Sequence, residues 1–156
     1  MRLLASKPVR TRILSAALVL ALATAIFVAP PVSANRGVGP CNAERAADET
    51  IQHFMKRKIR CAVDLFGPVP GDAARAICIA KRESGLIPTA ESPTGMYLGL
   101  FQQSAKMWPD RYVQWTDPAW QLSQKATNGR TNAIVTIRMV HAAGSWKAAG
   151  WPSDGC

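Results

Sequence analysis

Glu83 is the acidic residue whose place in the sequence best suits acid–base chemistry. A helix over residues 72–84 turns about once every 3.6 residues. Glu83 therefore falls on the same side as the apolar residues of this segment, which are Ala76, Ile79 and Ala80. The remaining polar side chains and a cysteine occupy the other side: Arg75, Cys78, Lys81 and Arg82. Arg82 is accordingly expected to point to a different face from Glu83.

These surroundings favour the protonated form of the Glu83 carboxyl group. Apolar neighbours remove solvation from a carboxylate, and the last turn of a helix lies at the negative end of the helix dipole. A carboxylic acid that stays neutral near physiological pH can serve as a general acid. The alternative is a structural glutamate that pairs with a core arginine, for which Arg111 and Arg138 are the candidates.

The residues that follow Glu83 form an ordered pattern. Glu83 opens the run Glu-Ser-Gly-Leu-Ile-Pro-Thr-Ala-Glu-Ser, which ends at Ser92 and is followed by Gly95 and by Gly-Leu-Phe-Gln at 99–102. This pattern resembles the lysozyme-like transglycosylase family, in which Glu-Ser precedes an apolar residue, Pro, Ala and Ser at fixed offsets and then Gly-Ala-x-Gly-Leu-Met-Gln. Residues 72–103 carry the resemblance, and residues 132–146 share it more loosely.

The second block departs from the family pattern at three positions. Met96 replaces the usual alanine, Phe101 replaces the usual methionine, and Leu98 is a one-residue insertion before Gly99. These departures bear on the shape of the cleft wall and leave the identity of Glu83 unaffected.

The resemblance implies a role for several side chains around Glu83. It makes Glu83 the general acid and base, and it places Ser92 and Gln102 beside it in a substrate cleft. Each also has a structural alternative, since Ser92 can cap a turn and Gln102 can bond loop backbone. The flat aromatic side chains of Tyr97 and Trp146 are the candidates for stacking on sugar rings, with the other tryptophans expected in the core.

A single catalytic acid on a glycan leaves two reactions open. Hydrolysis needs a second carboxylate, about 6.5–9.5 Å away for inversion or about 5 Å away for retention. The candidates are Glu91, Asp110 and Asp117, and no feature of the sequence selects among them. The route implied by the resemblance to lytic transglycosylases uses Glu83 twice: it protonates the glycosidic oxygen and then deprotonates the 6-hydroxyl of the sugar, which closes an anhydro ring.

The elements that must position these residues are mostly helices. Apolar residues recur at helical spacing from Ala43 to Phe66, which predicts one long first helix or two in line. The Pro- and Gly-rich segment 67–71 ends it, and Asp72 is the expected N-cap of the helix over 72–84, which Gly85 terminates.

The second half of the chain predicts a loop region and one further clear helix. Pro and Gly residues make 85–103 a loop or short hairpin, and short helical turns are expected around Trp108 and Trp120. A helix over 132–143 ends at Gly144, and the tail from Ser145 is expected to be loop. The predicted fold class is therefore mainly α, a small domain that the resemblance makes lysozyme-like.

The N-terminal residues have the composition of a secretory signal peptide. Four basic residues precede an apolar run from Ile13 to Ala29, and Val32 and Ala34 suit signal peptidase. We therefore expect residues 1–34 to be removed, leaving one domain over 35–156 with no stable membrane insertion. An uncleaved signal anchor is the alternative.

All four cysteines lie in residues 35–156, and an even number in a small exported domain predicts two disulfides. A first helix from Ala43 to Phe66 would separate Cys41 from Cys61 by about 30 Å, beyond disulfide reach. Cys61 and Cys78 are nearly equidistant from the Pro68–Pro70 turn. We therefore predict the pairs Cys61–Cys78 and Cys41–Cys156.

No metal or cofactor is expected. The sequence has no Cys-x-x-Cys pair, and His53 and His141 lack the spacing of zinc ligands. Residues 35–156 carry fifteen Lys and Arg against ten Asp and Glu, a net charge of +5 that favours an anionic polymer. The basic cluster at 56–60 has no accompanying nucleic-acid motif, so nucleic acid is not an expected partner, and this cluster alone reads as a solvated helix face.

Residues and resemblance together predict a monomeric protein secreted to the cell wall. Its expected partner is the peptidoglycan glycan strand, in which it would cleave the β-1,4 bond between MurNAc and GlcNAc as a lytic transglycosylase or a muramidase. One alternative is a non-catalytic glycan-binding or inhibitory protein of the same fold, although binding alone does not require a buried acid. The other is a basic membrane-active protein, which the chain length, cysteines and modest charge disfavour.

Overall fold

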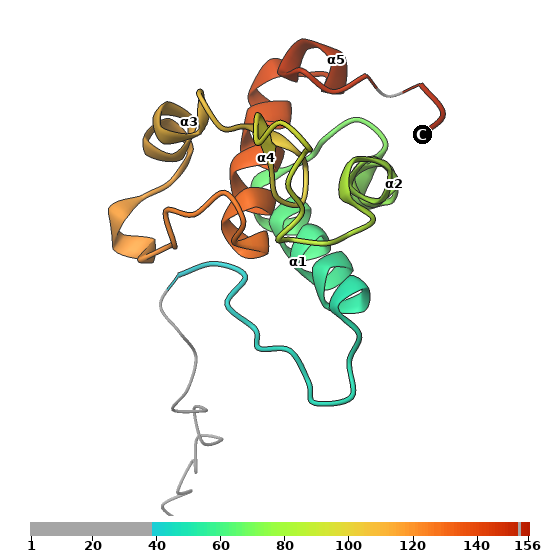
Figure 1. The fold of residues 1–156 in the computed structure, drawn as a ribbon, viewed down its shortest axis with the longest axis vertical. Helices are drawn as coiled ribbons and strands as arrows, with labels where there is room; N and C mark the ends of the chain where they lie inside the picture. Colours follow the sequence, from blue (N-terminus) through green and yellow to red (C-terminus); the bar gives the residue numbers. More distant parts are fainter. Residues whose placement is uncertain (1–38, 153) are drawn as a thin grey trace, which may run out of the picture. The chain divides into compact units, whose positions relative to one another are not determined.

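Helix α4, Gly129–Ala143, lies in the middle of the domain, and three of the other helices pack directly against it (Figure 1). The computed structural model describes residues 39–152 and 154–156. The predicted signal peptide, residues 1–34, and the predicted start of the domain at Asn35 lie outside the described residues. Residues 131–137 of α4 are all buried, whereas its last three residues are exposed, and Ile134, Ile137 and Val140 belong to the main hydrophobic core.

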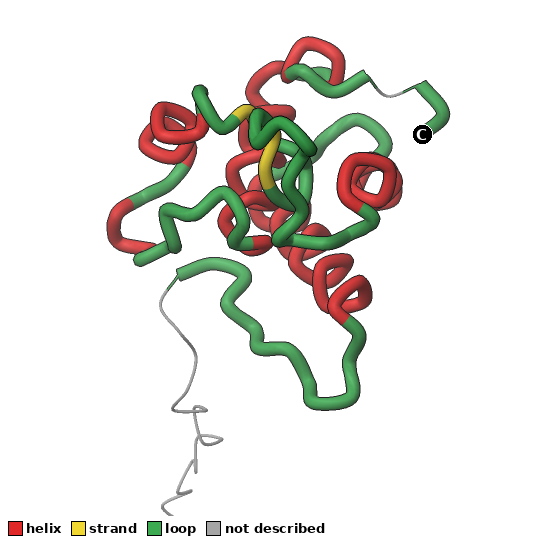
Figure 2. The backbone as a smooth tube through the Cα atoms, viewed as in Figure 1, coloured by secondary structure: helices red, strands yellow, loops and turns green. Residues whose placement is uncertain are grey.

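The described residues form a mainly helical fold with a small hairpin, as the sequence predicted (Figure 2). Besides α4, the helices are α1 (Ile51–Phe66), α2 (Asp72–Ser84), α3 (Trp108–Trp115), the 3-10 helix η1 (Pro118–Trp120) and α5 (Trp146–Ala149). Strands β1 (Tyr97–Leu98) and β2 (Gln103–Ser104) pair antiparallel. None of the helices among the described residues combines the length and apolar character needed to cross a membrane.

Helix α1 begins at Ile51, and the predicted start at Ala43 is wrong. Thr50 caps the helix by accepting a hydrogen bond from the backbone N–H of His53. The residues before Thr50 double back along α1 as a loop. Lys58 holds this loop because its buried ammonium group donates to the backbone carbonyls of Cys41 and Ala43.

Because of this loop, the cysteines pair differently from the prediction. The structure has the disulfides Cys41–Cys61 and Cys78–Cys156, with Cα atoms 5.7 and 5.6 Å apart. The predicted pairs Cys61–Cys78 and Cys41–Cys156 are therefore wrong. The separation of about 30 Å between Cys41 and Cys61 assumed helix from Ala43 onward, and it disappears once residues 41–50 fold back.

Helix α2 has the predicted bounds, Asp72–Ser84, with Gly85 at its C-terminus in the left-handed conformation, φ 63°. Its N-cap is Gly71, and not Asp72 as expected. Ala76, Ile79 and Ala80 are buried on the face that meets the core. The last turn of α2 thus carries Glu83 to the rim of the core.

The hairpin lies where sequence analysis expected loop or hairpin, and α4 holds its turn in place. Gly99 approaches α4 and the loop before it so closely that a Cβ atom there would lie 2.1 Å from the carbonyl oxygen of Ala126, in that loop, and 2.5 Å from Nδ2 of Asn132. Asn132 is fully buried; it accepts a hydrogen bond from the N–H of Phe101 and donates to the carbonyl of Ala126. A glycine is therefore required at this contact.

The C-terminal residues contain a short helix where only loop was expected. Ser145 caps α5 by accepting from the N–H of Ala148, and Gly150 ends the helix. The residues after it, 150–152 and 154–156, are the C-terminal tail. The tail runs toward α2 (Figure 1), and the disulfide Cys78–Cys156 attaches it there.

Candidate active site

Glu83 lines a hollow of about 320 Å³ where α2, the hairpin and the C-terminal tail meet. This Glu83 hollow is lined by Glu83, Tyr97, Gln102, Gly150, Trp151 and Pro152. Three of the predicted site residues, Glu83, Tyr97 and Gln102, are thereby brought together from separate segments. Ser92 and Trp146 are not among the lining residues.

The carboxylate of Glu83 is paired with Arg82. The Nη2 and Nε atoms of Arg82 donate to Oε1 of Glu83 at 2.9 and 3.2 Å. The side chain of Glu83 is 25% exposed, so it lies at the rim of the apolar arc and not inside it. The expectation that Arg82 points to a different face is wrong, because Arg82 binds both Glu83 and the carbonyls of the tail. The buried carboxyl group without a charged partner that the sequence predicted is therefore not found.

The two arginines suggested as structural partners of Glu83 bind elsewhere. Arg111 donates to Oε1 of Gln103. Arg138 donates to the carbonyl of Trp115, and its guanidinium lies over the ring of Trp120. The arginine that pairs with Glu83 is instead its neighbour in the chain.

Arg82 also connects Glu83 to the C-terminal tail. Its Nη2 donates to the carbonyl of Pro152 at 2.5 Å and its Nη1 to the carbonyl of Asp154 at 3.1 Å. All three nitrogen atoms of the guanidinium are therefore engaged. Since Arg82 contacts only Oε1 of Glu83, the other carboxylate oxygen has no hydrogen bond to the described residues.

Gln102 occupies the turn of the hairpin with a positive φ of 48°. Its amide nitrogen donates to the backbone carbonyls of Gly99 at 3.0 Å and Ala90 at 3.3 Å. The structural alternative for Gln102, a bond to loop backbone, is thus present. These two hydrogen bonds use only the amide nitrogen of Gln102. The amide oxygen can therefore accept a hydrogen bond from a ligand.

Ser92 and Tyr97 are joined by two hydrogen bonds. The hydroxyl oxygen of Ser92 accepts from the N–H of Tyr97 at 3.0 Å, and the N–H of Ser92 donates to the carbonyl of Tyr97 at the same distance. Ser92 therefore closes the turn that presents Tyr97, whose side chain is exposed at the hollow. The position of Ser92 agrees with its alternative prediction as a residue that caps a turn.

Trp146 is a core residue, which corrects its prediction as a cleft residue. It is 1% exposed, it stacks on Phe101, and its indole N–H donates to the carbonyl of Pro70. Trp151 takes the place at the hollow instead. Its ring packs edge-on against Phe101 and Trp146, and its indole N–H donates to the carbonyl of Phe101 at 2.7 Å.

The residue after Glu83 joins the helix to the hairpin. The hydroxyl group of Ser84 donates to the carbonyl of Leu100 at 2.8 Å. Together with the bond from Trp151 to Phe101, this contact holds the 99–102 turn between α2 and the tail. The positions of Glu83 and Gln102 are therefore coupled through backbone contacts on both sides.

Glu83 is the sole acidic residue among those that line its hollow. The other candidate carboxylates do not line it. Asp110 lines a different hollow, Asp117 caps η1, and Glu91 forms a backbone bridge to Leu98. Among residues 39–152 and 154–156, no three His, Cys, Asp or Glu side chains are grouped so as to hold a metal ion.

Comparison with known proteins identifies no relative of this chain. No protein-family model matches the chain, and neither the curated proteins nor the solved structures contain a significant match to it.

Proposed function

We propose that this chain is an exported enzyme that cleaves the β-1,4 glycosidic bond of peptidoglycan between MurNAc and GlcNAc, with Glu83 as its single catalytic acid and base. The observation that carries the proposal is the convergence of Glu83 from the end of α2, Tyr97 from β1 and Gln102 from the hairpin turn on one hollow. The resemblance of residues 83–102 to lysozyme-like transglycosylases gives these same residues a catalytic setting.

The residues of the hollow supply the groups that glycan cleavage needs. Oε2 of Glu83 is the carboxylate oxygen left to meet the glycosidic oxygen, because Arg82 occupies Oε1. Gln102 offers an amide oxygen to a sugar hydroxyl, and Tyr97 offers an exposed aromatic face. No metal or cofactor takes part in this chemistry.

The reaction that best fits one carboxylate is intramolecular transglycosylation. Glu83 donates its proton to the glycosidic oxygen as the C–O bond breaks, and the leaving sugar departs as an alcohol. The Glu83 carboxylate then takes the proton of the 6-hydroxyl while that oxygen bonds to the anomeric carbon. Glu83 ends protonated again, no water is consumed, and the new chain end is a 1,6-anhydro sugar.

Product analysis distinguishes this reaction from hydrolysis. Purified mature protein would be incubated with peptidoglycan and the products examined by mass spectrometry. Anhydro ends support transglycosylation, whereas ends heavier by one water establish a muramidase that uses a second carboxylate. Absence of any cleavage, with binding of glycan retained, would establish the non-catalytic glycan-binding protein instead.

A further inference from the structure

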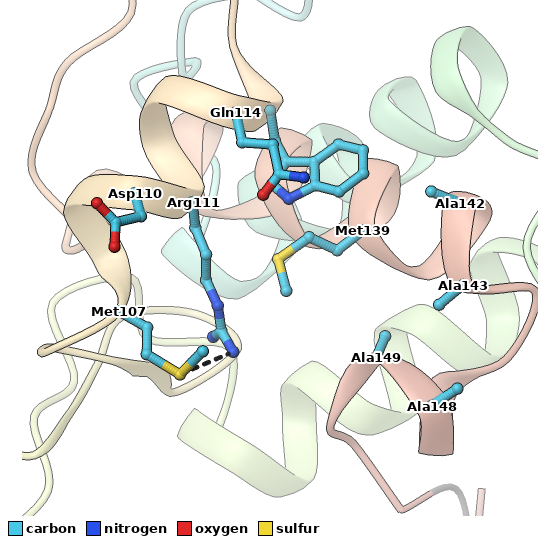
Figure 3. Close-up of a pocket in the computed structure, with 10 residues that line it drawn as sticks. Met107, Asp110, Arg111, Gln114, Met139, Ala142, Ala143, Ala148 and Ala149 are labelled. Atoms are coloured by element: carbon cyan, nitrogen blue, oxygen red, sulfur yellow. Dashed lines mark hydrogen bonds between the residues drawn. The ribbon is translucent and has the colours of Figure 1, made fainter.

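A second hollow, larger than the Glu83 hollow, lies between α3, the end of α4 and α5 (Figure 3). Its volume is about 470 Å³. Much of its lining is small or apolar, with Met139 beside four alanines, Ala142, Ala143, Ala148 and Ala149. Arg111 projects into this surface from α3, and we call the site the Arg111 hollow.

The guanidinium of Arg111 is held by one buried polar side chain, Gln103, and contacts the exposed Met107. Nη1 donates to Oε1 of Gln103 at 2.5 Å, and Nη2 contacts the sulfur of Met107 at 3.6 Å. Gln103 is fully buried and donates in turn to the hydroxyl of Thr136 at 2.7 Å. Arg111 is therefore fixed in place before any ligand arrives.

Arg111 has no acidic partner among the described residues, since none of their ion pairs includes it. The carboxylate of its neighbour Asp110 points away from the guanidinium (Figure 3). Burial lowers the pKa of Arg111, because the partly buried guanidinium loses some of its solvation. An arginine has five N–H donors, and the contacts to Gln103 and Met107 use two of them.

The Arg111 hollow adjoins the Glu83 hollow along two segments. Ala149 lines the first and the next residue, Gly150, lines the second. On the hairpin, Gln103 bonds Arg111 while the preceding residue, Gln102, lines the Glu83 hollow. Consecutive residues of these two segments therefore belong to the two hollows.

We propose that the Arg111 hollow binds the acidic peptide that branches from the glycan strand, with the guanidinium of Arg111 binding a carboxylate of that peptide. This inference rests on the proposed function of the Glu83 hollow. A sugar ring requires polar partners for its hydroxyl groups, whereas only Asp110, Arg111 and Gln114 among the ten lining residues have polar side chains and the others are apolar. A short peptide of alanine and acidic residues offers methyl groups to the alanines and a carboxylate to Arg111.

The test compares two ligands on two matched variants. The ligands are a peptide-bearing glycan fragment and the same fragment after an amidase has removed the peptide. The variants are Arg111→Met and, as a control for net charge, Arg60→Met on the exposed face of α1. Both are made in a Glu83→Gln background so that the fragments survive during titration calorimetry.

The expected result is a selective loss. Arg111→Met weakens binding of the peptide-bearing fragment about tenfold or more, as the loss of a charge-assisted hydrogen bond does, and leaves the stripped fragment and the Arg60→Met variant unaffected. Equal losses for both fragments, or no loss, would overturn the proposal. The stripped fragment carries a free lactyl carboxylate, so its tight, Arg111-dependent binding would assign the site to that group instead.

A second measurement does not depend on the folding of a variant. In the Glu83→Gln protein, methyl NMR signals of Ala142, Ala143, Ala148 and Ala149 should shift with the peptide-bearing fragment and not with the stripped one. Shifts that are identical for the two fragments would refute the peptide site.

The two proposals fail in different ways. If the wild-type protein releases no glycan products but the alanine methyl groups shift selectively, the cleavage proposal fails and the peptide site stands. If wild type and Arg111→Met cleave peptide-bearing and stripped glycan equally well, cleavage stands and the peptide site fails.

Discussion

The guanidinium of Arg82 binds the carboxylate of Glu83 and, on the same planar group, the backbone carbonyls of Pro152 and Asp154. The candidate catalytic acid is thereby joined to the tail that forms one wall of its hollow. The disulfide Cys78–Cys156 attaches the same tail about one turn before Arg82 on α2. The shape of the Glu83 hollow thus depends on contacts between α2 and the end of the chain.

Replacing Glu83 by glutamine should abolish glycan cleavage while the protein stays folded. The amide keeps the shape of the side chain and can still accept from Arg82, but it cannot donate the catalytic proton. Loss of a general acid typically lowers the rate about 10²–10⁴-fold. Product release from labelled peptidoglycan measures this, with Glu91→Gln as the matched control; turnover above roughly one per cent of wild type would remove Glu83 from the catalytic role.

Arg82→Met should loosen the tail and lower activity. The change removes a partly exposed ion pair and two hydrogen bonds to carbonyls, so we expect a loss of about 1–2 kcal/mol in the free energy of unfolding. Urea unfolding measures it, with the exposed neighbour Lys81→Met as control. Equal stability and equal activity in the two variants would show that Arg82 has no positioning role.

The two disulfides should have unequal effects on activity. A Cys78→Ser/Cys156→Ser variant releases the tail beside Glu83, whereas Cys41→Ser/Cys61→Ser releases only the loop before α1. We expect the first variant to lose most of its glycan cleavage and the second to keep it. A non-reduced peptide map should first show these same two pairings in the wild type; a peptide joining Cys61 to Cys78 would contradict the structure.

The same two variants should also differ in stability. The disulfide Cys78–Cys156 spans 78 residues and Cys41–Cys61 spans 20. Each typically contributes about 2–4 kcal/mol, and the loop-length dependence makes the longer one worth about 1 kcal/mol more. Guanidinium unfolding of both variants checks the order, which the reverse ranking would contradict.

Lys58 should make stability rise in alkaline solution. Burial lowers the pKa of Lys58 from 10.5 to about 8 in the folded protein. Between about pH 8 and 10.5 the unfolded chain therefore binds more protons than the folded one, and the free energy of unfolding increases with pH, by about 3 kcal/mol at most. Comparing wild type with Lys58→Met at both ends of this range isolates the effect, and a difference that stays constant would refute it.

Glu49 should make the stability of the protein depend on pH in acidic solution. Two hydrogen bonds of 2.7 Å from Arg57 hold the pKa of Glu49 at about 2, below its ordinary value of 4.5. The stability contributed by the charged pair is therefore complete above about pH 4.5 and is lost as the pH falls toward 2. Thermal melts of Glu49→Gln should show a lower melting temperature than wild type at pH 7 and a shrinking difference below pH 4.5. A difference independent of pH would contradict this assignment.

Local signals in the sequence were enough to place Glu83. The periodicity of Ala76, Ile79 and Ala80, and the glycine after Ser84, define α2 and its end because a helix is set by contacts between near neighbours in the chain. The same kind of signal gave the hairpin region and the end of α4 at Gly144. Gln102 was predicted because the pattern after Glu83 resembles that of a known family, and Tyr97 because its flat aromatic ring suits the face of a sugar.

Only the tertiary structure decided which distant segments complete the site. The cysteine pairing, the burial of Trp146 and the place of Trp151 all depend on how the chain folds back before Ile51 and after Gly150. The partner of Glu83 was missed for a similar reason: Arg82 turns toward Glu83 where its guanidinium also meets the carbonyls of the tail, more than 60 residues later in the sequence. Such contacts leave no periodic signal, because their energy comes from groups that meet only after the helices have packed.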